Sequence, residues 1–249
     1  METSTTQIDT AMGHAQEPPT LTAADYLAWE AEQPLRHEFL DGKLIDREGA
    51  EDRHVTVAGN LSMALRHHLS GSPCRTYMSD MRLHVAADNG YFYPDVMVTC
   101  SAADLASSMV KTEPKLIVEV LSPTTASYDR GLKFSHYRSL ASLKEYVLID
   151  LDTRSTDCYR KGADGLWVLH PFALGESVSL ASVALALTAA QLFADVIEAW
   201  VLLRHLARPP GDPLARQPPY FSAPNTFLST ALPVPTGSWR ICFSSSPIM

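Results

Sequence analysis

The chain has 249 residues, 46% of them hydrophobic, and a formal net charge of −8 at pH 7. This length and composition are sufficient for one medium-sized domain with a buried core. The acidic balance argues against a protein that binds nucleic acid strongly and non-specifically, because phosphate contacts require Lys and Arg; a local basic patch stays compatible with it.

The sequence predicts neither export nor membrane insertion. No apolar run approaches the roughly 18 to 20 residues of a membrane span, and residues 1–19 lack the basic start and apolar block of a secretory signal. The cysteines, Cys74, Cys100, Cys158 and Cys242, form no Cys-x-x-Cys pair, so they predict neither a zinc knuckle nor a disulfide scaffold. We therefore expect a cytoplasmic protein with reduced core cysteines and no membrane partner.

Composition divides the chain into three segments. Residues 1–19 are rich in Thr, Gln, Glu and Pro without periodicity, which is typical of a disordered segment. Residues 20–207 carry the periodic apolar patterns of a folded domain. Residues 208–249 hold nine prolines among Ser and Thr, which predicts a Pro-rich disordered tail. We expect a single domain between two disordered ends.

Apolar residues at helical spacing predict the helices of this domain. The first is introduced by a Thr-x-x-Asp capping pattern at Thr22. The third carries Asp129, Lys133 and His136 at spacings of three and four, which places these side chains along one polar face. The expected helices are residues 22–32, 54–69, 127–140 and 188–206.

Short runs rich in Val and Ile, bounded by Pro, Ser or Asn-Gly, predict strands. Residues 178–187 are apolar, but their pattern favours neither a helix nor a strand. The alternation of helices and strands predicts an α/β fold with a mixed central β-sheet flanked by helices. The expected strands are residues 43–45, 74–85 (as one or two strands), 93–100, 114–122, 144–150, 156–160 and 166–170.

Two of these expected strands each carry one carboxylate. Asp95 opens the first after Pro94, and Glu119 interrupts the second between Val118 and Val120. Alone, Asp95 could cap a turn and Glu119 could pair with a Lys or Arg, since an unpaired buried charge costs several kcal/mol. Side by side, the two acids repel each other unless a cation lies between them, and carboxylate oxygens are preferred ligands of Mg²⁺.

Three further residues are candidates for the same site. Glu38 lies near the end of an early helical segment, just before the sheet, where it is either a solvated acid or a site acid. His54 opens a helix, either as a polar cap or as a group that faces the site. Lys133 is either the i, i+4 partner of Asp129 on a solvated face or the cation of the site. Tyr137 we assign to packing.

A metal-dependent phosphodiesterase needs this set, because two acids can hold Mg²⁺ against a phosphate oxygen while a cation steadies the attacking hydroxide. Over roughly residues 20 to 200 the chain resembles the Uma-type restriction endonuclease family, formerly catalogued as a domain of unknown function, in the PD-(D/E)xK nuclease superfamily. The matching motifs are His37–Gly42 (HEFLDG), His54, Tyr93–Val96 (YPDV), Val118–Thr125 (VEVLSPTT), the helix with Asp129, Lys133 and Tyr137, and Glu145–Asp150 (EYVLID).

The resemblance implies a restriction-endonuclease-like fold and a DNA substrate. It implies that Asp95 and Glu119 are ligands of Mg²⁺ or Mn²⁺, and that Glu38 is the accessory helix acid of the superfamily. The lysine of the superfamily motif should lie two residues after Glu119, where this chain has Leu121. In this family a helix lysine is thought to replace it, and Lys133 occupies that place.

Other functions stay open at this stage. A catalytically inactive nuclease fold, kept as a module for DNA binding or protein interaction, is favoured by Leu121 and by the net charge of −8. A different phosphodiester or nucleotide substrate is a third alternative. By analogy with enzymes that cut both strands, a homodimer is the expected assembly.

Overall fold

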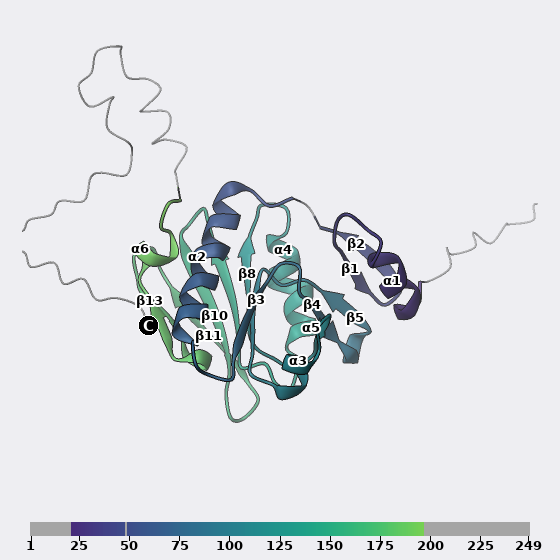
Figure 1. Ribbon diagram of the computed structural model, residues 1–249. Helices are drawn as coiled ribbons and strands as arrows, with labels where there is room; N and C mark the ends of the chain where they lie inside the picture. Colours follow the sequence, from purple (N-terminus) through teal and green to yellow (C-terminus); the bar gives the residue numbers. More distant parts are fainter. Residues whose placement is uncertain (1–20, 48, 197–249) are drawn as a thin grey trace, which may run out of the picture. The chain divides into compact units, whose positions relative to one another are not determined.

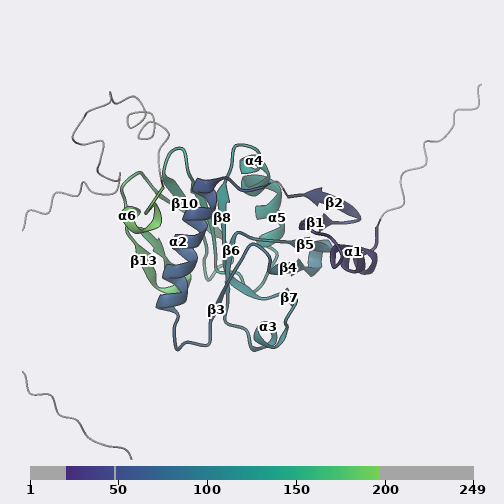
Figure 2. The ribbon, with the colours of Figure 1, turned by 45° about the horizontal axis from the view of Figure 1, so that its top comes forward.

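The computed structural model describes residues 21–47 and 49–196. They form a mixed α/β fold in which β-sheets are flanked by helices, as the sequence predicted (Figures 1 and 2). The expected disordered segments, residues 1–19 and 208–249, lie outside the described residues.

The larger sheet has six strands, and all neighbours in it are antiparallel except β8 and β9. The two strands predicted to carry the acids, β6 and β8, are neighbours in it. In spatial order its strands are β11 (Trp167–Phe172), β10 (Ser155–Lys161), β9 (Glu145–Asp150), β8 (Pro114–Leu121), β6 (Val96–Thr99) and β3 (Arg75–Met78).

A separate five-stranded sheet lies beside it, so the expected single central sheet is in fact two sheets. The segment from Cys74 to Val85 is divided between them, because the chain turns at Ser79 (φ 22°) between β3 and β4. The order in this sheet is β2 (Lys43–Asp46), β1 (His37–Leu40), β5 (Gly90–Phe92), β4 (Arg82–Val85) and β7 (Val110–Lys111). The apolar segment of undecided type forms a small antiparallel pair, β12 (Val178–Leu180) and β13 (Leu185–Leu187).

Glu38 is not a helix acid, which corrects the expectation from the sequence. It is the second residue of β1, which pairs with β2 across a turn at Asp41 (φ 45°) and Gly42 (φ 87°). The preceding helix ends at Glu30, before Pro34. The Asp-Gly turn therefore joins two strands, where we had expected a helical segment followed by a strand.

The helices are α1 (Ala23–Glu30), α2 (Asp52–His68), α3 (Ala102–Ala106), α4 (Ala126–Tyr128), α5 (Phe134–Tyr137) and α6 (Ala189–Leu192). The capping box at Thr22 is present. A π-helical turn, Asp129–Lys133, joins α4 to α5, and we call the continuous segment of residues 126–137 the α4–α5 helix. The helix expected over residues 188–206 ends at Leu192, and its expected residues from 197 onward lie outside the described part.

Side-chain alternation along the six-stranded sheet sends residues to two different cores. Val118, Val120 and their strand neighbours pack against α2, which covers one face (Figures 1 and 2). Ile117 and Leu121 pack on the other face, with Tyr137 of the α4–α5 helix. Glu119 lies between Ile117 and Leu121 on β8, at the same alternation. Its side chain therefore points to the same face of the sheet, towards the α4–α5 helix.

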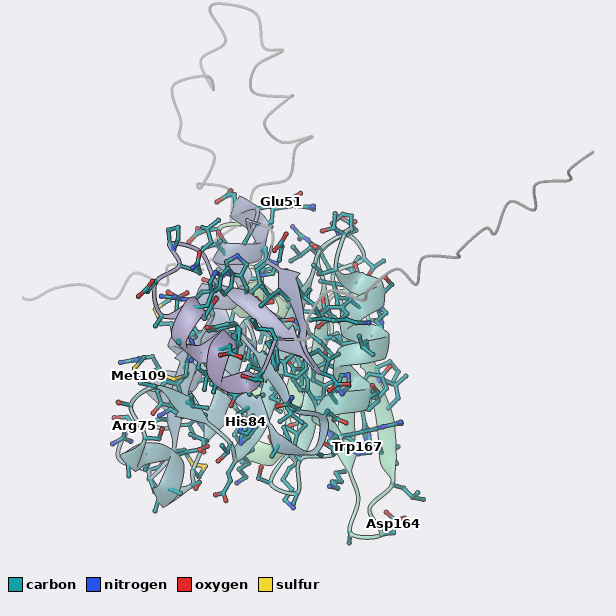
Figure 3. All side chains as sticks on the ribbon, turned by 90° about the vertical axis from the view of Figure 1, so that its right-hand side faces the viewer. Glu51, Arg75, His84, Met109, Asp164 and Trp167 are labelled. Atoms are coloured by element: carbon teal, nitrogen blue, oxygen red, sulfur yellow. A yellow bond between two sulfur atoms is a disulfide. The ribbon has the colours of Figure 1, made fainter. Side chains whose placement is uncertain are left out.

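Two ends of the described part of the chain can be distinguished in Figure 3. The labelled Glu51, immediately before α2, lies at one end, and Asp164, in the turn between β10 and β11, lies at the other. None of the helices in the described ranges combines the length and apolarity needed to cross a membrane. The expected cytoplasmic location stays a prediction.

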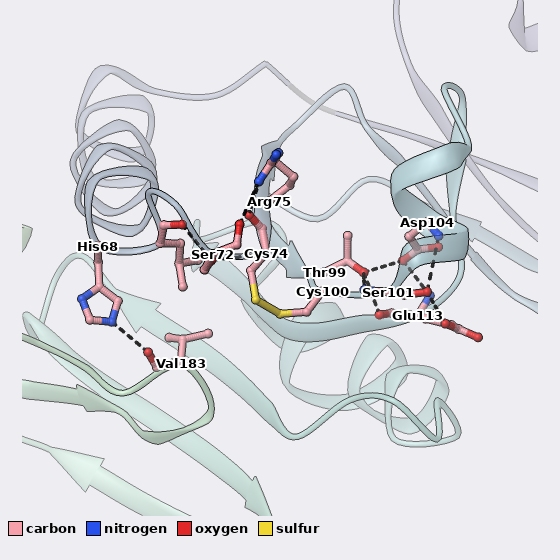
Figure 4. Close-up of a disulfide and its surroundings, with 11 residues drawn as sticks. His68, Ser72, Cys74, Arg75, Thr99, Cys100, Ser101, Asp104, Glu113 and Val183 are labelled. Carbon is pink, nitrogen blue, oxygen red and sulfur yellow. Dashed lines mark hydrogen bonds between the residues drawn. A yellow bond between two sulfur atoms is a disulfide. The ribbon is translucent and has the colours of Figure 1, made fainter.

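Cys74 and Cys100 form a disulfide, which makes the expectation of reduced cysteines wrong for this pair (Figure 4). The β3–β6 ladder pairs Arg75 with Thr99, so the two cysteines are the next cross-strand neighbours. Their separation of 26 residues gave no motif to recognise in the sequence. Cys158 is buried with a free thiol, as expected.

We expect the disulfide to stabilise the fold by about 2–4 kcal/mol, because it restricts the unfolded chain over a loop of this length. Urea denaturation of the wild type with and without dithiothreitol measures this difference. The Cys74→Ser/Cys100→Ser double variant is the control and should not respond to the reductant. Equal wild-type stability in both conditions, with no gain of two titratable thiols on reduction, would contradict the expectation.

Candidate active site

Asp95 and Glu119 are cross-strand neighbours at the end of the β6–β8 ladder. Val96 is paired with Val118, so the next step of this antiparallel register sets Asp95 opposite Glu119. The Asp95 N–H donates to Glu119 Oε2 (3.2 Å), and the Val120 N–H donates to Asp95 Oδ2 (2.8 Å). These reciprocal bonds fix both carboxylates, and each side chain lines the same cavity.

The ammonium group of Lys133 lies among three carboxylates. Its Nζ atom is 3.2 Å from Glu119 Oε1, 3.2 Å from Asp129 Oδ1 and 3.3 Å from Glu38 Oε1. Lys133 is 7% exposed and the three acids are 1–2% exposed. An ammonium has three N–H donors, so the number of nearby acceptors matches the number of donors. The contact with Asp129 that we had considered for a solvated face therefore exists, but it is buried.

Three tyrosine residues hold two of these carboxylates, Glu119 and Glu38, in place. The Tyr137 hydroxyl donates to Glu119 Oε1 (3.0 Å), and the Tyr128 hydroxyl donates to Glu38 Oε2 (3.1 Å). The backbone N–H of Tyr93 donates to Glu38 Oε1 (3.2 Å). The assignment of Tyr137 to packing alone was incomplete, because its hydroxyl binds the central acid.

His54 and Arg47 flank Asp95 on its other side. His54 is the third residue of α2, and its Nε2 atom lies 3.1 Å from Asp95 Oδ2. Of the two roles considered for His54, the structure therefore supports the one that faces the site. Arg47 follows β2, and its guanidinium lies 3.7 Å from Asp95 Oδ1.

A cavity of about 680 Å³ contains these groups. Its lining includes Asp95, Glu119, Glu38, His54 and Lys133, so the structure brings together every residue predicted for the site. Leu121 also lines it, on the strand face that carries Glu119. In the sequence these residues extend from Glu38 to Lys133, over almost one hundred positions.

The two central acids differ in their electrostatics. Burial raises the pKa of Asp95, but the hydrogen bond and charge of His54, with the charge of Lys133, leave it below the ordinary value. Burial raises the pKa of Glu119 to about 8; Lys133 opposes this rise, while the charges of Asp95, Asp129 and Glu38 add to it. The pair therefore combines an ionised and a proton-holding carboxyl group, as expected for like charges in close contact.

Lys133 stays protonated in this environment. Burial by itself would lower its pKa, but the charges of Glu119, Glu38, Asp129 and Asp95 raise it well above the ordinary value. A lysine in this state stabilises negative charge and cannot accept a proton from water at neutral pH.

Some site residues had recognisable signals in the sequence and others had none. Asp129 and Tyr137 lie four residues on either side of Lys133, so helical spacing could have identified one polar stripe. Tyr128 and Arg47 follow no period. The π-helical turn, a feature common at functional sites, had no signal either.

The donor set fits a hard cation held by few protein ligands. In the described ranges, no group of three or more His, Cys, Asp or Glu side chains is arranged to hold a metal ion. Mg²⁺ keeps several waters and binds through one or two carboxylates together with substrate phosphates. The adjacent carboxylates of Asp95 and Glu119 match this mode of binding; burial, and then the charge of Asp95, raise the pKa of Glu119.

We expect the free energy of unfolding to fall as pH rises from about 6 to 8. In this window folded Glu119 keeps a proton that the unfolded chain, with an ordinary pKa of 4.5, has released, so raising the pH favours unfolding. The slope should be on the order of 1 kcal/mol per pH unit. Urea denaturation at several pH values measures it, and Glu119→Gln should flatten the dependence. Identical slopes in both proteins would refute this assignment.

Comparisons with known proteins identify the family of the chain. Residues 23–192 match the model of the Uma2 family, described as "Putative restriction endonuclease". Two proteins of Synechocystis sp. (strain PCC 6803) are similar: uncharacterized protein slr1290 is 35% identical over 68% of this chain and 88% of its own length. Uncharacterized protein sll1609 is 38% identical over 64% of this chain and 91% of its own length.

A solved structure shares the fold. It is described as "a putative nuclease belonging to DUF820" from Anabaena variabilis, with a TM-score of 0.58 and 18% identity. The match covers 69% of this chain and 97% of that one. At this level of identity the likeness establishes the fold alone. The match of residues 23–192 establishes the family, so this chain belongs to the Uma2 family, as its motifs predicted.

Proposed function

We propose that the protein is a Mg²⁺-dependent endonuclease that hydrolyses phosphodiester bonds of DNA. The observation that carries this proposal is the convergence of Asp95, Glu119 and Lys133 on one cavity, in a chain whose family is described as "Putative restriction endonuclease". Two adjacent acids with a buried ammonium are the groups that metal-assisted phosphodiester hydrolysis requires. A homodimer stays a prediction, for which light scattering in solution is the test.

Asp95 and Glu119 would hold the ion, either Mg²⁺ or Mn²⁺. Bound there, the ion would polarise a phosphate oxygen and lower the pKa of a water molecule. The backbone bonds from Asp95 and Val120 fix the orientation of both carboxylates before any ion arrives. Because the pKa of Glu119 is raised to about 8, this carboxyl group would have to give up a proton at neutral pH to hold the ion.

Lys133 would act through its charge. With its pKa raised, the ammonium stays protonated, so it would stabilise negative charge that develops on the phosphate and would not act as a general base. Glu38 and Asp129 would keep this ammonium beside Glu119, since both lie within 3.3 Å of it. In this assignment Glu38 positions Lys133. Glu38 would act as the accessory acid of the superfamily, but from a strand and not from a helix.

A non-catalytic nuclease fold is the second candidate, as a module that binds DNA or a protein. Leu121 favours it, because the superfamily motif has its lysine at this position. The apolar side chain of Leu121 packs into the hydrophobic core beneath the α4–α5 helix. The engagement of Lys133 by three acids also favours it, since these ion pairs balance the charge of the ammonium without a substrate. The two candidates differ in metal binding and in turnover.

Asp95→Asn should abolish both metal binding and DNA cleavage, while it preserves the shape of the side chain. We expect the wild type to cut supercoiled plasmid with Mg²⁺ and to bind Mn²⁺ in isothermal titration. The variant should lose at least about 10²-fold in cleavage rate, which is the usual effect of removing one key electrostatic group. Parallel incubations with single-stranded DNA and RNA distinguish the substrate classes.

Asp46→Asn provides the matched control. Asp46 is an exposed acid that lines the same cavity, so the substitution removes the same charge without touching the central pair. It should cut DNA at close to the wild-type rate. Mn²⁺ binding without any cleavage would favour the non-catalytic module, and undiminished Mn²⁺ binding by Asp95→Asn would remove the metal site from the proposal.

A further inference from the structure

The cavity is strongly acidic for a site that would receive DNA. Eight carboxylate side chains line it, against three cationic ones, Arg47, Arg53 and Lys133. A phosphate group that enters therefore meets mostly like charge, and its binding depends on which cation can still donate to it. Lys133 is surrounded by three acids, and Arg53 contacts Asp152 (3.2 Å) and Glu51 (3.7 Å).

Arg47 differs from these two cations. Its Nη1 atom donates to the carbonyl oxygen of Ser79 (3.1 Å), and its guanidinium carbon lies 5.6 Å from the centre of the Tyr93 ring. These contacts fix the plane of the guanidinium at the cavity wall, where the side chain is 25% exposed. A guanidinium has five N–H donors, and the bond to Ser79 uses one of them.

The carboxylate nearest to Arg47 does not form a close pair with it. Arg47 Nη2 is 3.7 Å from Asp95 Oδ1, which is longer than a charge-assisted hydrogen bond of about 2.7–2.9 Å. The other oxygen of Asp95 is bound at 2.8 Å by the Val120 N–H and lies 3.1 Å from His54. Among the described residues, Ser79 accepts the one hydrogen bond of the Arg47 guanidinium, and Asp95 is its nearest carboxylate, at 3.7 Å.

We propose that Arg47 is a phosphate-binding residue, which holds an oxygen of a substrate phosphodiester next to Asp95. Planar guanidinium groups match phosphate oxygens in geometry, and a pre-oriented one loses little conformational entropy on binding. The inference rests on the proposed function, because it takes the phosphodiester as the ligand of this cavity. It adds the group that binds the substrate to those that would bind the metal.

The test compares Arg47→Met with Arg53→Met, which remove the same charge from the same cavity. Binding of a fluorescent DNA duplex is measured at several salt concentrations with Ca²⁺ in place of Mg²⁺, and electrophoresis verifies that the DNA stays intact. We expect Arg47→Met to weaken binding about tenfold and to reduce the slope of log K against log salt by about one. Arg53→Met should stay within about twofold of the wild type.

The results distinguish two roles of Arg47, a phosphate-binding residue and a counter-ion of Asp95. Equal affinities of the two variants would overturn the proposal and would leave Arg47 as a distant counter-ion of Asp95. Arg47→Lys, which keeps the charge but loses the planar fork, should bind with intermediate affinity; thermal melting of each variant identifies loss of fold. If the wild type binds neither the DNA duplex nor an RNA duplex tested in parallel, the proposed function and this inference both fail. If the wild type binds and Arg47→Met binds equally well, the inference alone fails.

Discussion

The buried ammonium of Lys133 is the contact on which the rest of the site depends. It joins three elements that are distant in sequence: Glu38 on β1, Glu119 on β8, and Asp129 on the α4–α5 helix. Three acids this close, each at most 2% exposed, would repel one another and lose their hydration without a cation. Removing one partner of such a buried group typically costs about 3–5 kcal/mol, so the cluster constrains the fold as well as the chemistry.

The same contact explains how a nuclease-like site can exist with Leu121 at the position of the motif lysine. Leu121 lies on the face of β8 that carries Glu119 and packs with the α4–α5 helix. That helix covers this face, so a lysine on it reaches Glu119 from the opposite direction, at 3.2 Å. Under the proposed function, Lys133 supplies from the helix the positive charge that the motif lysine would supply from the strand.

The asymmetry of the two acids has a consequence for metal binding. Asp95 is ionised because His54 and the Val120 N–H stabilise its charge, whereas Glu119 is held protonated by burial and by its acidic neighbours. Under the proposed function, Glu119 would lose its proton when both acids hold an ion, which would couple the affinity for the ion to pH. The Tyr137 hydroxyl and Lys133, both at Glu119 Oε1, keep that carboxyl group in one orientation during this exchange.

The sequence by itself determined the helices and strands that have a regular hydrophobic period, and it identified the central pair of acids. Two successive Val-rich runs were enough to predict neighbouring strands that each carry one acid, Asp95 or Glu119, and helical spacing was enough to place Lys133 beside Asp129. Only the tertiary structure decided that Glu38 lies on a strand, that Tyr137 binds Glu119, that Cys74 joins Cys100, and that Arg47 reaches Asp95. These contacts join segments from different sheets, turns and helices. Sequence periodicity describes which face of one element is buried, but it contains no information on which distant group that face will meet.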